Sequence, residues 1–506
     1  MQPEPEAPSI TSRVVESTAW VIAWRIVTRN LGLISTLCLV RLLAPADFGL
    51  VALAIAFAST VDALSTLGVQ DALLRHSSPT RDLYDTAFGL GLVRGLITAL
   101  LIVGGAWPAA EFFKEPRLII VLVALAVGTM ITAFENIGTV DFRRDMTFRK
   151  EFNLQVFSRL FGVFLTIGIA LIWHNYWALI AGTLATRAAR LCQSYVMSRY
   201  RPRFSLRAWR RLIHFSLWTW ALTMLGQIRD RTDSFVIGRA LTTTDVALFS
   251  IGQEVGSLPN SEVVEPLHRT LFSAFVLLRN SAGSPRNLFL NTIEAGFLLI
   301  LPAGIGISAV ADPLVHLLLG DRWVASIPIV QIAAAVSTIS IFRVVSDAHY
   351  NATGELRLTF WLCSVSAFAR IPLLLFFVAK AGLPGAAWAL AISSVIDQVL
   401  YVGVTAPRLG ITALDMVRRL WRAIVACIAM TAGLFQMGMG WTPTQASDPL
   451  GLTVDLATRS TLGAVLFIAT LIVLWFAAGR PDGAERYFLG MIRGQCSRLG
   501  ILGTAR

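Results

Sequence analysis

Two arginines, Arg25 and Arg29, stand inside the first long apolar stretch of this 506-residue chain. They are four residues apart, so a helix places both side chains on one face. Two cations on one helix face repel each other and need an anionic partner. The candidates are Asp62 in the second apolar stretch, an acid from another helix, or an anionic ligand. Because a guanidinium donates two hydrogen bonds at once to phosphate, phosphate would suit this spacing well.

Many other ionisable residues also lie in apolar stretches, where a charge is expensive without a partner or water. Taken singly, each is explained by a buried ion pair or by a long side chain that reaches the membrane interface. Taken together, their number predicts a shared aqueous cavity between two lobes of the chain. We assign substrate binding to Arg25, Arg29, Asp62, Arg94 and Arg231, and ion coupling to Glu254 and Glu262. The other members of the set include Glu135, Arg159, Arg187, Arg190, Arg229, Asp230, Asp233, Glu265, Glu294, Arg343, Asp347, Arg370 and Asp397.

No motif for covalent or hydrolytic chemistry accompanies these charges. The sequence has no phosphate-binding P-loop, so no built-in ATPase is expected. Its five cysteines and six histidines show no metal-ligand spacing, and the cysteines form no CxxC pair. We therefore expect no cofactor, no metal site and no enzymatic activity.

The composition indicates that these residues are carried by membrane-spanning helices. Hydrophobic residues make up 55% of the chain and charged residues 15%, whereas soluble proteins carry roughly a quarter charged residues. Apolar stretches of about 20 residues, long enough to cross a bilayer, recur along the whole chain. The sequence predicts an all-α, polytopic membrane protein with about 14 transmembrane helices. The expected ranges are 17–40, 48–70, 84–107, 117–140, 152–173, 176–197, 211–238, 246–268, 288–310, 327–350, 356–379, 382–405, 420–440 and 456–479.

The net charge of +12 is concentrated in alternate short loops between these stretches. Such a distribution follows the positive-inside rule and does not suggest nucleic-acid binding. It predicts that loops such as 141–150, together with both termini, lie in the cytoplasm. The first residues are Pro-rich and acidic and lack the build of a signal peptide, so we expect a disordered cytoplasmic tail.

The pattern Arg-x-Leu-x-x-x-Asp-x-x-Leu occurs twice, at residues 41–50 and 239–248. Each copy follows a long apolar helix, and the predicted span count places both copies on the outer side. Two parallel six-helix lobes around a central cavity are therefore expected, followed by two extra helices. The charges of each copy are explained by helix ends, because a cation suits a C-terminus and an acid an N-terminus. The predicted organisation is a tail at 1–16, lobes at 17–205 and 206–405, helices at 406–480 and a cytoplasmic tail at 481–506.

Several ordered segments resemble the Wzx-type polysaccharide flippases of the multidrug/oligosaccharidyl-lipid/polysaccharide (MOP) exporter superfamily, in the exopolysaccharide and colanic-acid branch. They include RLLAPADFGLVALA from Arg41, DFRRDMTFRK from Asp141, TDSFVIGRAL from Thr232 and ADPLVHLLLGDRWVAS from Ala311. The resemblance implies alternating access and an undecaprenyl-diphosphate-linked oligosaccharide as cargo, moved to the outer leaflet of the bacterial inner membrane. Cationic cavity residues are a theme of such flippases, and Arg25 and Arg29 occupy a suitable place.

The segment around Glu254, Glu262 and Glu265 is more acidic than the resemblance leads us to expect. These acids are interpreted as proton- or ion-coupling sites, or as partners of Arg229 and Arg231. The expected partners are the lipid-linked oligosaccharide, membrane lipid, and the polymerase and glycosyltransferases of the same pathway.

Two other functions remain open at this point. A multidrug/cation antiporter of the same superfamily would favour acidic residues in its cavity, so Arg25 and Arg29 count against it. A membrane glycosyltransferase or polymerase should carry a long outer loop with acids or a DxD-like metal site, and neither is evident in the sequence.

Overall fold

The computed structural model describes residues 10–65, 73–74, 79–212, 217–279, 284–446, 448–481, 483 and 485–486. Within these residues every regular element is a helix, which confirms the predicted all-α class. The chain divides into two compact units, residues 1–247 and 248–506. This division lies one helix later than the predicted lobe boundary at 205. The first helix begins at Ile10, inside the predicted tail, and residues 1–9 and 487–506 lie outside the described part.

Within the described residues each predicted apolar stretch is mostly helical, although 117–140 is interrupted after Ala133. The elements are α1 (Ile10–Leu42), α2 (Pro45–Leu64), α4 (Arg81–Phe113), α5 (Leu118–Ala133), η1 (Ile137–Val140), α6 (Asp141–Arg144), α7 (Phe148–Trp173), α8 (Trp177–Met197), α9 (Trp209–Leu212), α10 (Leu217–Ala240), α11 (Thr243–Gly256), η2 (Asn260–Val264), α12 (Glu265–Arg279), α13 (Pro285–Ala309), α14 (Ala311–Leu318), η3 (Asp321–Ser326), α15 (Ile327–Ser337), α16 (Ile341–Thr353), α17 (Leu356–Arg408), α18 (Ala413–Gln436) and α19 (Pro449–Ala477). Within the described ranges, six helices are long and apolar enough to cross a membrane, and two bent pairs bring the number to eight. The count of 14 spans stays a prediction.

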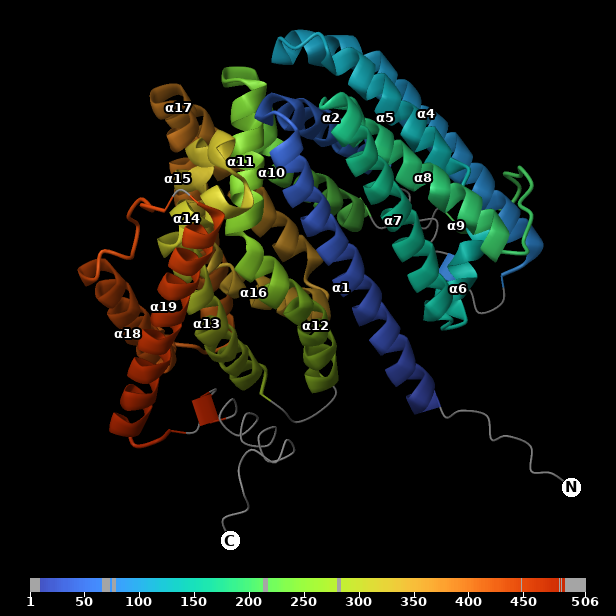
Figure 1. The fold of residues 1–506 in the computed structure, drawn as a ribbon. Helices are drawn as coiled ribbons and strands as arrows, with labels where there is room; N and C mark the ends of the chain where they lie inside the picture. Colours follow the sequence, from blue (N-terminus) through green and yellow to red (C-terminus); the bar gives the residue numbers. More distant parts are fainter. Residues whose placement is uncertain are drawn as a thin grey trace, which may run out of the picture. The chain divides into compact units, whose positions relative to one another are not determined.

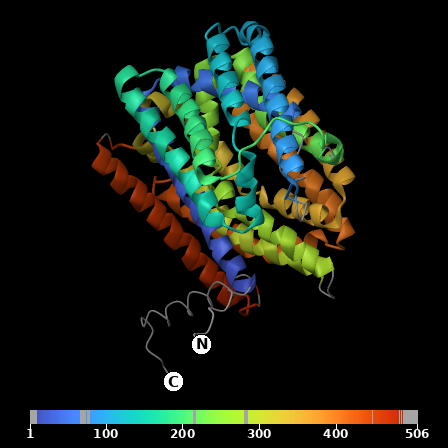
Figure 2. The same cartoon turned by 90° about the vertical axis from the view of Figure 1, so that its right-hand side faces the viewer.

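In the first unit, helices distant in the sequence pack side by side. Helix α1 packs along α7, α7 along α8, and α8 against α5, which also contacts α2 and α4. Figure 1 shows α4, α5, α7 and α8 running next to one another, and Figure 2 views this unit from their side. This arrangement brings charged positions of α2, α4 and α8 within reach of one another, next to α5.

Two glycines set the close approach of α7 and α8. A Cβ atom added at Gly162 would lie 1.7 Å from Thr186 Oγ1, and one added at Gly182 would lie 1.6 Å from Thr166 Oγ1. Each hydroxyl donates to a carbonyl of its own helix, at 2.8 Å for Thr186 and 2.7 Å for Thr166. Both hydroxyl groups thus have a hydrogen-bond acceptor, and their oxygen atoms pack against the glycine of the facing helix. Small residues at such crossings let membrane helices approach closely where no hydrophobic effect drives them together.

The repeated motif forms two helix connections, as its capping residues predict. Arg41 lies in the last turn of α1, and Asp47 lies in the first turn of α2. In the second copy Asp245 accepts hydrogen bonds from the Thr242 amide and hydroxyl, at 3.0 and 2.7 Å. The two copies also touch, because a Cβ atom at Gly49 would lie 1.6 Å from the Thr243 carbonyl oxygen. Only a residue without a side chain fits at position 49.

The second unit is built around α13, which packs against α15, α16 and α18. Helix α17 contains a break at Gly382, whose φ of 59° lies in the left-handed region that glycine adopts without strain. The last two helices, α18 and α19, lie side by side (Figure 1). Two arginines of α18 form ion pairs with neighbouring segments. Arg422 Nε lies 2.7 Å from Glu485, and Arg419 lies 2.9 Å from Glu294. These ion pairs tie α13, α18 and the segment after α19 together.

The glycine contacts between α7 and α8 make a direct prediction. Replacing Gly162 by Ala should destabilise the protein by about 1–3 kcal/mol, because the new methyl group overpacks the crossing. Gly168 on the same helix α7 has open space around its Cβ position, so Gly168→Ala is the matched control. The control should be neutral or stabilising, because Ala is favoured over Gly in helices by about 1 kcal/mol. Thermal unfolding of the detergent-solubilised variants measures both, and equal midpoints for the two would contradict the close crossing.

Candidate functional site

A cavity of about 410 Å³ lies inside the first unit, between α2, α4, α5, η1 and α8. Its wall combines apolar side chains, such as Ile55 and Phe88, with an unusual number of polar ones. The polar lining residues are Ser59, Asp62, Arg94, Thr129, Thr132, Glu135, Asn136, Thr139, Thr183 and Arg187. A polar cavity between apolar helices is the surrounding that ionisable groups need at such depth.

An ion pair between Asp62 and Arg94 lies on one side of this cavity. Arg94 Nη2 is 2.7 Å from Asp62 Oδ1, and Arg94 Nε donates to Ser65 at 3.4 Å. Half of the Asp62 side chain (51%) stays accessible, so the pair faces the cavity. Arg187 on α8 lies near enough to attract the Asp62 charge electrostatically. One carboxylate therefore serves two guanidinium groups.

The floor of the cavity is a break in the helical backbone. Helix α5 ends at Ala133, and the next helical segment, from Ile137 to Arg144, turns away by 69°. The fully buried Asn136 stabilises the break. Its backbone N–H donates to the Ser194 hydroxyl at 3.0 Å, and its side-chain Nδ2 donates to the Tyr200 carbonyl at 2.7 Å. Its Oδ1 accepts from the Gly138 amide at 2.9 Å. These bonds replace backbone hydrogen bonds that the helix gives up at this point.

The segment after α8 braces this break from the other side. Tyr200, whose carbonyl receives the Asn136 amide, donates its hydroxyl to Asp85 of α4 at 2.6 Å. The Arg203 amide donates to the same carboxylate at 2.7 Å. Burial, together with the hydrogen bond to Asp85, raises the pKa of Tyr200 well above its ordinary value. The phenol therefore keeps its proton and remains a donor throughout the physiological pH range.

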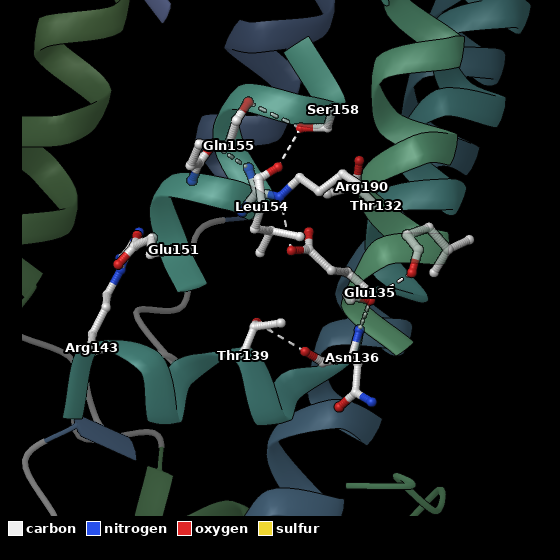
Figure 3. A network of polar contacts seen from close by, with 12 residues as sticks. Thr132, Glu135, Asn136, Thr139, Arg143, Glu151, Leu154, Gln155, Ser158 and Arg190 are labelled. Carbon is white, nitrogen blue, oxygen red and sulfur yellow. Dashed lines mark hydrogen bonds and ion pairs between the residues drawn. The ribbon is translucent and has the colours of Figure 1, made fainter. Parts of the chain in front are cut away.

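A second, smaller cavity of about 30 Å³ adjoins the first and shares Glu135 and Thr139 with it. This volume exceeds the roughly 10–15 Å³ that one water molecule needs. Glu135 accepts from Arg190 Nε at 2.8 Å, and Arg190 Nη1 reaches Gln155 at 3.4 Å. Arg143 pairs with the buried Glu151 at 2.6 Å in the same wall. Figure 3 shows both ion pairs and the helix break between them.

Two of the predicted site residues, Asp62 and Arg94, are brought together here. Arg25 and Arg29 lie half-buried on α1, which packs on α7, and neither is among the residues that line the cavity. The Arg25 guanidinium lies 5.8 Å from the Trp24 ring centre. On the same helix, a Cβ atom at Gly32 would lie 3.2 Å from Arg159 of α7, so this helix pair carries a further arginine near the predicted face.

The other predicted residues lie on later helices. Arg231 is half-buried on α10 in the first unit. Glu254 on α11 and Glu262 in η2 are exposed, in the second unit. Their assignment to ion coupling stays a prediction.

The two cavities also contain residues that were not assigned a role from the sequence: Glu135, Asn136 and Arg187 line the larger one, and Arg190 lines the smaller one. The three charged residues were recognised as charges in apolar stretches, but 117–140 was expected to be one continuous span. The signal that points to a break is the polar pair Glu135-Asn136 followed closely by Gly138, in an otherwise apolar stretch. Within the described residues, no three His, Cys, Asp or Glu side chains are grouped as metal binding would require.

Solved structures with similar folds are membrane transporters. The lipid II flippase MurJ, in an inward closed conformation, aligns with a TM-score of 0.71 and 10% identity over 92% of this chain and 100% of that one. An inward-facing multidrug resistance MATE family transporter of the MOP superfamily aligns with a TM-score of 0.60 and 16% identity, over 76% and 98%. At these identities the likeness shows the fold, that of a polytopic membrane transporter.

Sequence relatives point in the same direction. The succinoglycan biosynthesis transport protein ExoT of Rhizobium meliloti is 23% identical over 72% of this chain and 74% of its own length. The lipopolysaccharide biosynthesis protein WzxC of Escherichia coli is 20% identical over 82% and 85%. The model of one family, described as polysaccharide biosynthesis protein, matches residues 38–328, more than half of the chain. The chain belongs to this polysaccharide biosynthesis protein family.

Proposed function

We propose that this chain moves a lipid-diphosphate-linked oligosaccharide, a precursor of a surface polysaccharide, from the inner to the outer leaflet of the bacterial inner membrane. The family and the names of its relatives, which include a transport protein for succinoglycan, support a role in polysaccharide export. The fold shared with a lipid II flippase supports a lipid-linked cargo. The cargo lipid is undecaprenyl diphosphate in this proposal, and both termini lie in the cytoplasm.

The observation that carries the proposal is the excess of arginine around the two cavities of the first unit. Arg94 and Arg187 face the carboxylate of Asp62 in the larger cavity, while Arg190 pairs with Glu135 and Arg143 with Glu151 in the smaller one. Four cations thus meet three anions. A diphosphate supplies the missing negative charge and accepts charge-assisted hydrogen bonds from guanidinium groups. A volume of about 410 Å³ lies within the range of small-ligand sites, about 300–1,000 Å³, so it can admit a head group but not a long glycan.

The same excess weighs against a cation antiporter. A cationic drug entering this cavity would meet the arginines, and the two acids of its wall, Asp62 and Glu135, are already paired with arginine. The fold resemblance to a multidrug transporter does not bear on this point, because it concerns the backbone alone. A glycosyltransferase or polymerase finds no support in the relatives, which are named as biosynthesis and transport proteins.

Arg25 and Arg29 belong to the proposal as a further pair of phosphate ligands, since they remain on one face of α1 at helical spacing. Arg231 is included on the same reasoning, and Glu254 and Glu262 stay our candidates for ion coupling. Polymerase and glycosyltransferases of the same pathway are the proposed protein partners.

Deleting the gene should abolish surface polysaccharide and cause the lipid-linked intermediate to accumulate. The measurement is extraction of the lipid fraction together with quantification of cell-surface polymer. A plasmid copy should restore both. Loss of polymer without accumulation of the intermediate would place the defect in synthesis and would contradict a transport role.

The double variant Arg25→Ala/Arg29→Ala should lose polymer export while inserting normally into the membrane. The reason is that two guanidinium groups on one helix face are proposed to hold the diphosphate. Arg322→Ala, at an exposed position in η3, is the control and should export normally. Normal export by the double variant would remove this pair from the site.

Lysine substitutions separate charge from geometry at the cavity. If bidentate hydrogen bonding to phosphate matters, Arg187→Lys should restore export only partly relative to Arg187→Ala. If the positive charge alone matters, lysine should restore it nearly fully. Export equal to wild type in Arg187→Ala would show that the cavity of the first unit takes no part in cargo recognition.

A further inference from the structure

The two cavities of the first unit meet at one carboxylate. Glu135 lines both, together with Thr139, and sits at the break between α5 and η1 (Figure 3). We propose that Glu135 is a proton-binding site. It exchanges protons with water through the smaller cavity, and its charge affects the binding of an anion in the larger cavity. Its role in transport rests on the function proposed above, but its proton binding does not.

In this proposal, water reaches Glu135 from the end of the first unit that carries α6 and the residues directly after it. The Arg143 side chain is 47% exposed, whereas its partner Glu151 is only 7% exposed. From this ion pair the lining of the smaller cavity continues through Gln155 and Arg190 to Glu135. Polar groups therefore mark a way from Arg143 to Glu135, beside the apolar side chains Leu74, Val140, Phe142 and Leu154 of the same wall.

The backbone supports an aqueous path at this point. Non-helical backbone at membrane depth is tolerated where it is buried in protein or lines a water-filled cavity. Residues 134–136 are such a segment, and they line the first cavity at Glu135 and Asn136. Broken helices are also the places where membrane transporters gather ion-binding groups.

Every element packed around Glu135 contributes charges that set its behaviour. Helix α8 supplies Arg190 at 2.8 Å and Arg187 in the cavity wall, and α7 supplies Gln155 and Glu151. Helices α2 and α4 supply the paired Asp62 and Arg94, and α6 supplies Arg143. The nearest charge is that of Arg190, and the Glu135 side chain is 16% exposed.

Glu135 is better placed for this role than the other acids nearby. Asp62 lines only the larger cavity, and Glu151 lines only the smaller one. Protonation of Glu135 would neutralise the partner of Arg190 and add to the positive charge already present at Arg94 and Arg187. An anion in the larger cavity would then bind more tightly. By linkage, the bound anion would in turn favour the protonated carboxyl group.

The test compares Glu135 with an acid in a matched setting. Glu115 also pairs with an arginine at 2.8 Å, and its side chain is 15% exposed, but it lies in the connection between α4 and α5. The full-length protein in lipid nanodiscs is titrated by infrared spectroscopy, which detects the carbonyl stretch of protonated carboxyl groups. Compared with the wild type, the spectra of Glu135→Gln should lack the signal of one titrating carboxyl group. Glu135→Asp should keep it, with a shifted midpoint.

Glu115→Gln removes a different carboxyl and should leave the Glu135 signal in place. An unchanged titration in Glu135→Gln would overturn the proposal, even if polysaccharide export by the wild type is normal. Equally, a clear Glu135 titration in a protein that exports nothing would uphold the proton site and refute the proposed function.

The second readout is binding of inorganic pyrophosphate as a function of pH. Wild type and Glu115→Gln should bind it more tightly as the pH falls through the Glu135 titration. Glu135→Gln, which is permanently neutral, should bind tightly at all pH values and lose this part of the pH dependence. The titration of pyrophosphate itself is common to all three proteins and cancels in the comparison. The same pH dependence in all three would overturn the link between the proton and the anion.

Discussion

The break in the helix after Ala133 is the constraint on which the first unit depends. A membrane offers no water to a backbone that leaves its helix, so every freed group must find a partner in the protein. Asn136 supplies three hydrogen bonds at this point, and through the Tyr200 carbonyl it ties α5 to the segment after α8. The bend of 69° then opens the space in which the cavity forms. Glu135 and Asn136 enter the cavity wall at this departure from regular structure.

Around the two cavities of the first unit, the lining arginines outnumber the lining acids by one. Breaking a buried pair by removing one partner is costly, since the remaining charge is left without compensation. The pairs Asp62–Arg94 and Glu135–Arg190 are accessible from cavities, so water and ligands can share in that compensation. The buried pairs around Arg422 in the second unit differ, because they join helices and line neither described cavity.

Much of the fold could be predicted from hydrophobic stretches alone, because the length of an apolar helix is set by the bilayer. The helix connections at Asp47 and Asp245 could also be predicted, since capping depends on nearby residues. The cavity could not. Asp62 and Arg94 were identified as charges in need of a partner, but their pairing depends on how α2 and α4 pack. Glu135 was named only as one of many charges in apolar stretches, and Asn136 was not singled out, because a break that is stabilised by Ser194 and Tyr200 leaves little trace within its own stretch.

The contact between Gly49 and Thr243 limits how alike the two copies of the repeated motif can be. At the spacing of the repeat, Gly49 corresponds to Ala247. The position that packs against the Thr243 carbonyl in the first copy therefore carries a methyl group in the second copy. If the copies descend from a single ancestral segment, they had to diverge once they came to rest on each other. In that case the residues at the helix ends were kept in both copies, whereas the residues at the point of contact became different.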